Sequence, residues 1–177
     1  MLLHDMAYPT RTPHGAGRAR LTRSVTLCAL CLALLAAAGM GCGSSMRPLR
    51  LLVEVQVAPQ SNQNSPIPVT LVAVYDPKLY ERFSQMSAKQ WYEQRDQLRR
   101  DHPGGDAFIE WEWEFVPGFT PPPTVVEIRG RAVGAFVFAK YRSEGMHRVR
   151  LGPHQRIRIN LQEDDVTVST LAAPEGS

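Results

Sequence analysis

The chain has 177 residues and carries 20 Lys and Arg against 17 Asp and Glu, a formal net charge of +3. Four basic residues and one acidic residue lie within residues 1–41, so 16 of each sign remain in the rest of the chain. A neutral domain lacks the basic face that nucleic-acid binding requires, which argues against a nucleic-acid partner. The cysteines are Cys28, Cys31 and Cys42, so the part after Cys42 has no disulfide, thiol nucleophile or cysteine zinc ligand. About 135 residues are enough for one hydrophobic core.

Residues 1–41 have the layout of a bacterial lipoprotein signal peptide. Three arginines precede the apolar run Val25–Ala38, and the small residues Gly39-Met40-Gly41 lead to Cys42. We therefore expect cleavage before Cys42 and attachment of lipid to its thiol. Gly39 departs from the usual pattern, which has a leucine three residues before the cysteine.

Two other interpretations of this leader remain open. Residues 21–40 could be stretched into a transmembrane anchor, although a membrane span needs about 20 apolar residues. Alternatively, ordinary cleavage after Ala38 would leave Cys42 without lipid.

Strand patterns follow a short tether predicted at residues 42–49. Leu51–Val57 alternates apolar and polar side chains, which is typical of a half-buried strand. Val69–Tyr75 is apolar at nearly every position, as in strands that are buried on both faces. Between them, Ala58–Pro66 is polar and bounded by prolines, which predicts an exposed loop.

Two helices are predicted next. Asp76-Pro77 indicates a helix start, because Asp caps free backbone N–H groups and Pro is tolerated at the first helical position. Ser87-Ala88-Lys89-Gln90 has the pattern of a capping box for a second helix that extends to about Arg100.

The remaining elements are predicted to be strands. Ile109–Phe115 alternates strictly, with Ile109, Trp111, Trp113 and Phe115 on one face and Glu110, Glu112 and Glu114 on the other. Further strands are predicted at residues 124–128, 133–141, 147–151, 156–161 and 166–171, and the turn Gly152–Gln155 predicts a hairpin. We therefore predict an all-β fold, a β-sandwich of about seven to eight strands with a short helical insertion, over residues 50–171. Residues 172–177 form a polar tail.

No residue pattern points to catalysis, and we expect no enzyme activity, no cofactor and no metal site. The sequence has no nucleophile elbow, phosphate-binding glycine loop or HExxH pattern. The histidines lie in the leader, in turns or on a strand, without metal-ligand spacing: His4, His14, His102, His147 and His154.

Three surface features allow a functional and a structural interpretation. The row of three glutamates could bind calcium, or it could be solvated or paired with the arginines of the hairpin, which are Arg148, Arg150, Arg156 and Arg158. Those arginines could themselves bind an anion or a lipid headgroup. Trp111 and Trp113 could form a stacking platform for sugars, although inward strand positions favour a place in the core.

Several segments together suggest a family. They are the Leu-x-Val-x-Val strand, Pro68–Asp76, Leu79-Tyr80-x-x-Phe83, the helix Ser87–Arg100, Phe115-Val116-Pro117-Gly118 and the strand Gly134–Arg142. In order and spacing over residues 50–168 they resemble the type VI secretion outer-membrane lipoprotein, the TssJ family. The long proline-rich loop Pro117–Pro123 departs from the family pattern.

The resemblance implies a transthyretin-like β-sandwich on the periplasmic face of the outer membrane, anchored by lipid on Cys42. It implies a non-catalytic protein that binds the periplasmic domain of the inner-membrane component TssM. The loop between the first two strands contacts the partner in that family. At this position the chain has Gln60, Ser61, Asn62, Gln63, Asn64 and Ser65, of which Gln60, Asn62, Gln63 and Asn64 are expected to be most exposed.

Two other functions remain open. A sugar- or peptide-binding sandwich lipoprotein would expose Trp111 and Trp113 in a groove. An envelope hydrolase would bring polar groups together in a deep pocket.

Overall fold

The computed structural model describes residues 48–153 and 155–172. The elements in chain order are β1 (Leu49–Val57), η1 (Ser61–Asn64), β2 (Ile67–Val74), α2 (Pro77–Gln85), α3 (Ala88–Asp101), β3 (Phe108–Phe115), β4 (Thr124–Ile128), β5 (Gly134–Ala139), β6 (Arg148–Leu151), β7 (Arg156–Leu161) and β8 (Val166–Thr170). The signal peptide, Cys42, most of the tether, His154 and most of the polar tail lie outside the described residues.

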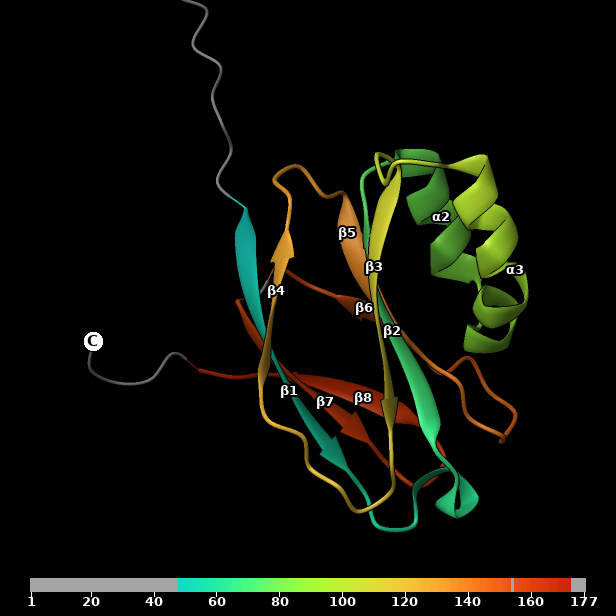
Figure 1. Cartoon of the computed structure of the whole chain (residues 1–177), viewed down its shortest axis with the longest axis vertical. Helices are drawn as coiled ribbons and strands as arrows, with labels where there is room; N and C mark the ends of the chain where they lie inside the picture. Colours follow the sequence, from blue (N-terminus) through green and yellow to red (C-terminus); the bar gives the residue numbers. More distant parts are fainter. Residues whose placement is uncertain (1–47, 154, 173–177) are drawn as a thin grey trace, which may run out of the picture. The chain divides into compact units, whose positions relative to one another are not determined.

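Two four-stranded sheets face each other, one in the order β4-β1-β7-β8 and the other in the order β3-β2-β5-β6 (Figure 1). β1 pairs in parallel with β7 and antiparallel with β4, and every other strand pair is antiparallel. The prediction of an all-β sandwich with a helical insertion is confirmed. The helices α2 and α3 cover the outer face of the second sheet (Figure 1).

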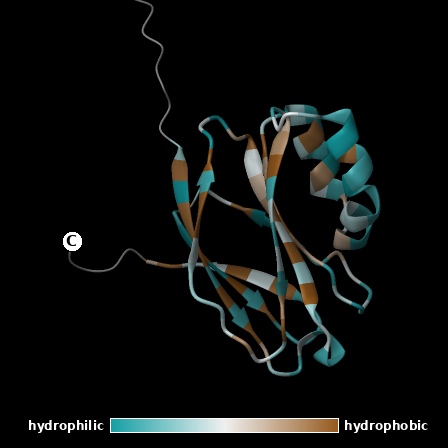
Figure 2. Cartoon of the chain, viewed as in Figure 1, coloured by the Kyte–Doolittle hydropathy of each residue, from teal (hydrophilic) through white to brown (hydrophobic). Residues whose placement is uncertain are grey.

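The second sheet separates two hydrophobic clusters. Along β2, Val69, Leu71 and Ala73 point into the space between the sheets, whereas Val72 and Val74 point toward the helices. All five side chains are fully buried. β2 is apolar at nearly every position because both of its faces are buried, as predicted. The brown inner faces and teal outer faces of the helices follow the same division (Figure 2).

Both helices begin at the predicted caps. The Asp76 carboxylate accepts hydrogen bonds from the backbone N–H groups of Lys78 and Leu79, at 2.7 and 3.0 Å. The Leu79 N–H is the main cause of a lowered pKa for Asp76. The capping box of α3 is complete, since the Ser87 hydroxyl accepts from the Gln90 N–H and the Gln90 side chain accepts from the Ser87 N–H.

The predicted hairpin between the last arginine-rich strands is wrong. β6 pairs with β5 in one sheet, whereas β7 pairs with β1 and β8 in the other. The connection between them therefore crosses from one sheet to the other. Alternating apolar side chains fit a hairpin and such a crossing equally well, because both arrangements place one face of each strand in a core. Leu151 of β6 and Ile157 of β7 belong to the same cluster between the sheets.

Candidate interaction surface

The loop between β1 and β2 contains a left-handed turn. Asn62, Gln63 and Asn64 have φ values of 49°, 54° and 58°, three consecutive residues in the region that disfavours L-amino acids. Each such residue other than glycine costs on the order of 1 kcal/mol, and asparagine tolerates it best. The structure around the loop must therefore hold this turn in place.

The predicted exposure of this loop is only partly correct. Gln60, Gln63 and Asn64 are exposed and Ser65 is half-buried. Ser61 and Asn62 are buried, with exposed fractions of 0% and 3%. The expectation that Asn62 is among the most exposed residues is therefore wrong, and the reason is its hydrogen bonding.

Asn62 fixes the loop to neighbouring segments through both ends of its side chain. Its Oδ1 accepts from the backbone N–H of Arg142 at 2.7 Å, and its Nδ2 donates to the carbonyl of Pro66 at 3.0 Å. Its own N–H donates to the carbonyl of Glu163 at 2.8 Å. The Ser61 hydroxyl donates to the carbonyl of Ala58 at 2.9 Å. The buried pair thus holds the exposed amides Gln63 and Asn64 in a fixed backbone conformation.

A second set of hydrogen bonds joins the β5–β6 loop to the β7–β8 turn. The buried ring of His147 lies between Asp165, whose Oδ1 is 2.9 Å from Nδ1, and the carbonyl of Ser143, 2.9 Å from Nε2. The Tyr141 hydroxyl shares its one proton between the carbonyls of Gln162 and Asp165, at 3.0 and 2.9 Å. Burial is the main cause of the raised pKa of Tyr141. These contacts make one connected end of the sandwich from three loops.

Ser143, His147 and Asp165 are the residue types of a hydrolytic triad, a group that sequence reasoning missed. Their hydrogen bonds do not suit that chemistry. Nε2 is 2.9 Å from the Ser143 carbonyl but 3.5 Å from the Ser143 hydroxyl, and a carbonyl accepts only from a protonated nitrogen. The Ser143 hydroxyl donates instead to the carbonyl of Asp164 at 2.9 Å. A base that could activate the hydroxyl is therefore not in place, and the group acts as a structural connection.

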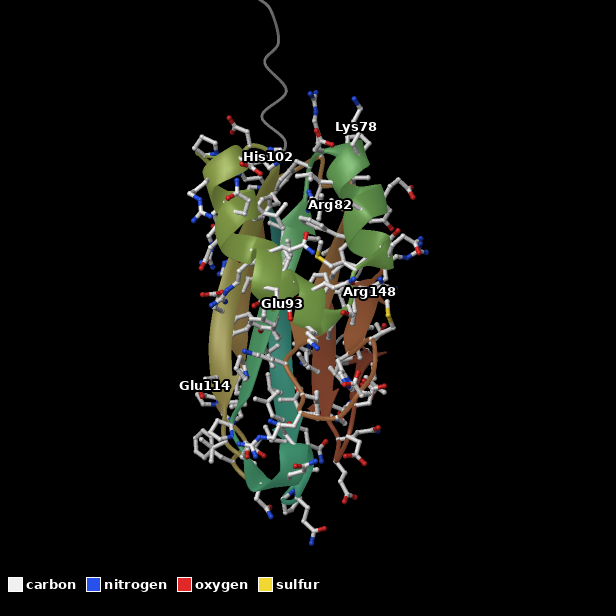
Figure 3. All side chains as sticks on the ribbon, turned by 90° about the vertical axis from the view of Figure 1, so that its right-hand side faces the viewer. Lys78, Arg82, Glu93, His102, Glu114 and Arg148 are labelled. Atoms are coloured by element: carbon white, nitrogen blue, oxygen red, sulfur yellow. The ribbon has the colours of Figure 1, made fainter. Side chains whose placement is uncertain are left out.

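Two of the three glutamates of β3 pair with arginines of α3, and not with the arginines of the last strands, which was one of the alternatives left open. Arg99 Nε lies 2.5 Å from Glu110 and Arg99 Nη2 lies 2.9 Å from Glu112, which Arg95 also contacts. The pKa of Arg99 is raised, chiefly by its hydrogen bond to Glu110. Glu114 is exposed and lies farther from the helices (Figure 3). Within residues 48–153 and 155–172, no group of three or more His, Cys, Asp or Glu is placed to hold a metal ion.

The four arginines expected on one face are divided between the outer faces of two sheets. Arg148 of β6 donates to the carbonyls of Phe83 and Met86 at 3.3 and 3.2 Å, so it caps the C-terminal end of α2 (Figure 3). Burial lowers the pKa of Arg148. Arg158 and Arg156 of β7 lie 2.9 and 3.6 Å from Glu54 of β1. No single anion site can therefore include all four.

Trp111 and Trp113 are half-buried and pack against the cluster between the sheets. They face the core as predicted, but β3 is an edge strand and leaves part of each ring accessible. Phe115, the third aromatic residue on this face of β3, is buried. Each tryptophan ring is therefore divided between packing against the core and an accessible part.

The described residues contain no helix that is both long and apolar enough to cross a membrane. Two cavities, of about 370 and 430 Å³, differ in the polarity of the side chains that line them. The first is apolar and lies near the start of β1, between Leu51, Ile128 and Leu151. The second lies beside His147 and is lined by Tyr92, Lys140 and other polar side chains.

Two facing sheets of four strands, with a pair of helices inserted after the second strand, define a two-layer β-sandwich. The structure is similar to the type VI secretion lipoprotein TssJ1 from Pseudomonas aeruginosa, with a TM-score of 0.57 and 19% identity over 72% of this chain and 99% of that one. It is also similar to Lip of Serratia marcescens, a membrane-bound component of the type VI secretion system, with a TM-score of 0.53 and 12% identity over 68% and 97% of the two chains.

A third similar chain belongs to the structure of the TssM C-terminal domain, residues 869–1107, from EAEC. Its TM-score is 0.50 at 14% identity, over 71% of this chain and all of that one. No protein-family model and no curated protein matches the sequence. The expected resemblance to TssJ is thus confirmed for the fold.

Proposed function

We propose that this chain is the outer-membrane lipoprotein of a type VI secretion system, without catalytic activity. Lipid on Cys42 anchors it at the periplasmic face, and the loop between β1 and β2 binds the periplasmic domain of a TssM-type component. The observation that carries the proposal is the match to TssJ1, which extends over 99% of that chain. The leader that ends at Cys42 supports the anchor, and Gly43 in place of Asp favours sorting to the outer membrane.

The loop supports the partner-binding part of the proposal by its chemistry. Gln60, Gln63 and Asn64 present amide donors and acceptors to solvent without a charge that would have to be desolvated. The buried Asn62 holds the left-handed turn before any partner binds. A loop that is already ordered loses less conformational entropy on binding. Ser61, Asn62 and Ser65 act in this proposal by shaping the loop.

Binding is tested by co-purification of the full chain with the TssM-type protein encoded in the same genome. Replacing Gln60, Gln63 and Asn64 together by Ala is expected to weaken the interaction at least about 10-fold. A matched control replaces the exposed Gln85 and Gln97 of the helices by Ala and is expected to leave binding unchanged. Unchanged binding of the loop variant would contradict the assignment of the loop. Failure of the intact chain to co-purify would contradict the proposed function as a whole.

The anchor is tested by the intact mass of the protein from the membrane fraction. A lipidated chain that begins at Cys42, a chain cleaved after Ala38 and an uncleaved chain have three different masses. The proposal expects the first, and the Cys42→Ser variant is expected to leave the membrane fraction. Retention of Cys42→Ser in the membrane would support the transmembrane alternative.

A further inference from the structure

A tight turn after β3 exposes two large apolar side chains that the fold does not use. Val116 and Phe119 are 55% and 58% exposed, the highest values among the large hydrophobic residues that the structure describes. Phe119 N–H donates to the Val116 carbonyl at 3.1 Å, and Gly118 has a φ of 73°. Together with Pro117 at the preceding position, these are the features of a type II turn. The sequence indicated a proline-rich loop here, Pro117–Pro123, without a role for Phe119.

The turn is built into the same end of the sandwich as the proposed partner loop (Figure 1). The Gly118 N–H donates to the carbonyl of Ala58 at 3.3 Å, and a Cβ at Gly118 would lie 3.7 Å from the Cα of Pro59. On its other side, the partner loop is bonded to Glu163 through Asn62. Across this end, the loop between β1 and β2 therefore lies between the Val116–Phe119 turn and the acidic turn Glu163–Asp165.

We propose that the Val116–Phe119 turn is the apolar anchor of the partner interface, with Phe119 entering an apolar pocket of the TssM-type periplasmic domain beside a basic patch that faces Glu163–Asp165. This inference rests on the proposed function and adds the second half of the contact surface. The three acidic side chains of the turn are exposed, so complementary charge is expected on the partner.

Physical reasons favour Phe119 as an energetic centre of this surface. Aromatic side chains carry a large apolar area and dominate many interfaces, where a few residues supply most of the affinity. The type II turn and the bond to Ala58 hold the ring's backbone in place, so little order has to be gained on binding. The amides beside it supply hydrogen bonds at the rim, which is the common arrangement of a binding surface.

The test measures the affinity of the purified full chain, in detergent, for the purified periplasmic domain of the TssM-type protein from the same genome. Phe119→Ser is expected to raise the Kd at least about 30-fold, while Phe119→Leu keeps an apolar side chain and is expected to raise it less than about 5-fold. Val133→Ser is the matched control, because Val133 is 44% exposed but lies between β4 and β5 at the other end. It is expected to bind like the unchanged chain.

Other outcomes overturn the inference in distinguishable ways. If the unchanged chain binds and Phe119→Ser binds within 3-fold of it, the anchor assignment fails while the proposed function stands. If the unchanged chain does not bind, both fail. If the chain alone self-associates and Phe119→Ser abolishes this, the patch joins two copies. Asp164→Lys is expected to weaken binding about 5-fold at low salt and less at high salt, and equal affinity would refute the basic patch.

Discussion

The helix-covered face of the second sheet and the loop end of the sandwich differ in how far their side chains contact other parts of the chain. On the helix face, Trp91 is fully buried, stacked on Phe138 at 5.1 Å and in edge contact with Phe83 at 5.3 Å. The charges above it are paired within the chain, as Arg99 with Glu110 shows. At the loop end, the backbone is in left-handed conformations, and amide and apolar side chains face solvent.

The difference separates what stabilises the molecule from what it can offer to a partner. Most side chains of the helix face already contact other parts of the chain, although Trp91 Nε1 and Glu110 Oε2 are buried without a hydrogen-bond partner among the residues that the structure describes. A ligand there would have to compete with ion pairs and aromatic packing. At the loop end, the hydrogen bonds of the buried Ser61 and Asn62 hold the exposed Gln63 and Asn64 in place. Backbone strain that is fixed by its surroundings is a feature of functional sites. Three substitutions test this division.

The largest effect is expected on the helix face. Trp91→Ala removes a large ring from a fully buried position and should lower the free energy of unfolding by about 3–5 kcal/mol. Urea unfolding followed by circular dichroism measures it. Trp113→Ala is the matched control, because that ring is only half-buried and should cost less. Equal losses for the two variants would contradict the packing described for α3.

An intermediate effect is expected at the buried anchor of the loop. Asn62→Ala leaves the Arg142 N–H and the Pro66 carbonyl without their partner and should lower the free energy of unfolding by about 1–3 kcal/mol. Gln60→Ala, on the same loop but exposed, should change it by less than about 0.5 kcal/mol. Chemical denaturation of both variants tests the difference. A neutral Asn62→Ala would mean that the turn does not depend on this side chain.

The smallest effect is expected with the opposite sign. Gln63 is exposed at a φ of 54°, so Gln63→Gly removes a steric cost and should raise the free energy of unfolding by up to about 1 kcal/mol. In α3, the exposed Gln97→Gly should lower it by about 1 kcal/mol, because glycine is unfavourable within a helix. Thermal unfolding of the two glycine variants gives the comparison. Destabilisation by both would remove the argument for strain in the loop.

The fold could be predicted closely where the local pattern decides the structure. The apolar run of β2, the cap at Asp76 and the capping box at Ser87 lie where the sequence indicates. The alternation of β3 also places its tryptophans and glutamates on the correct faces. In each case the signal lies within a few residues, and neighbouring side chains reinforce it.

The features that the sequence did not predict correctly depend on contacts between distant segments. The pairing of β6 and β7 with different strands cannot be deduced from their alternation. The pairing of Glu110 and Glu112 with α3 depends on how that helix packs over β3, which the sequence did not indicate. The burial of Asn62 depends on Arg142, which is 80 residues away in the chain. The Pro117-Gly118 pair was a usable signal for the turn that exposes Phe119.

The position of β1 has a mechanical consequence. The chain that follows Cys42 enters the sandwich at Leu49, and β1 ends at Val57, directly before the partner loop. If Cys42 carries lipid and the loop between β1 and β2 binds a partner, as proposed, a pull between the membrane and that partner would run along β1 itself. β1 is held on one side by β4 and on the other by β7, whose parallel register extends from Leu52 to Val57. Because the two points of attachment lie at either end of this one extended strand, its covalent backbone would carry the tension, while the bonds to β4 and β7 keep β1 in its sheet.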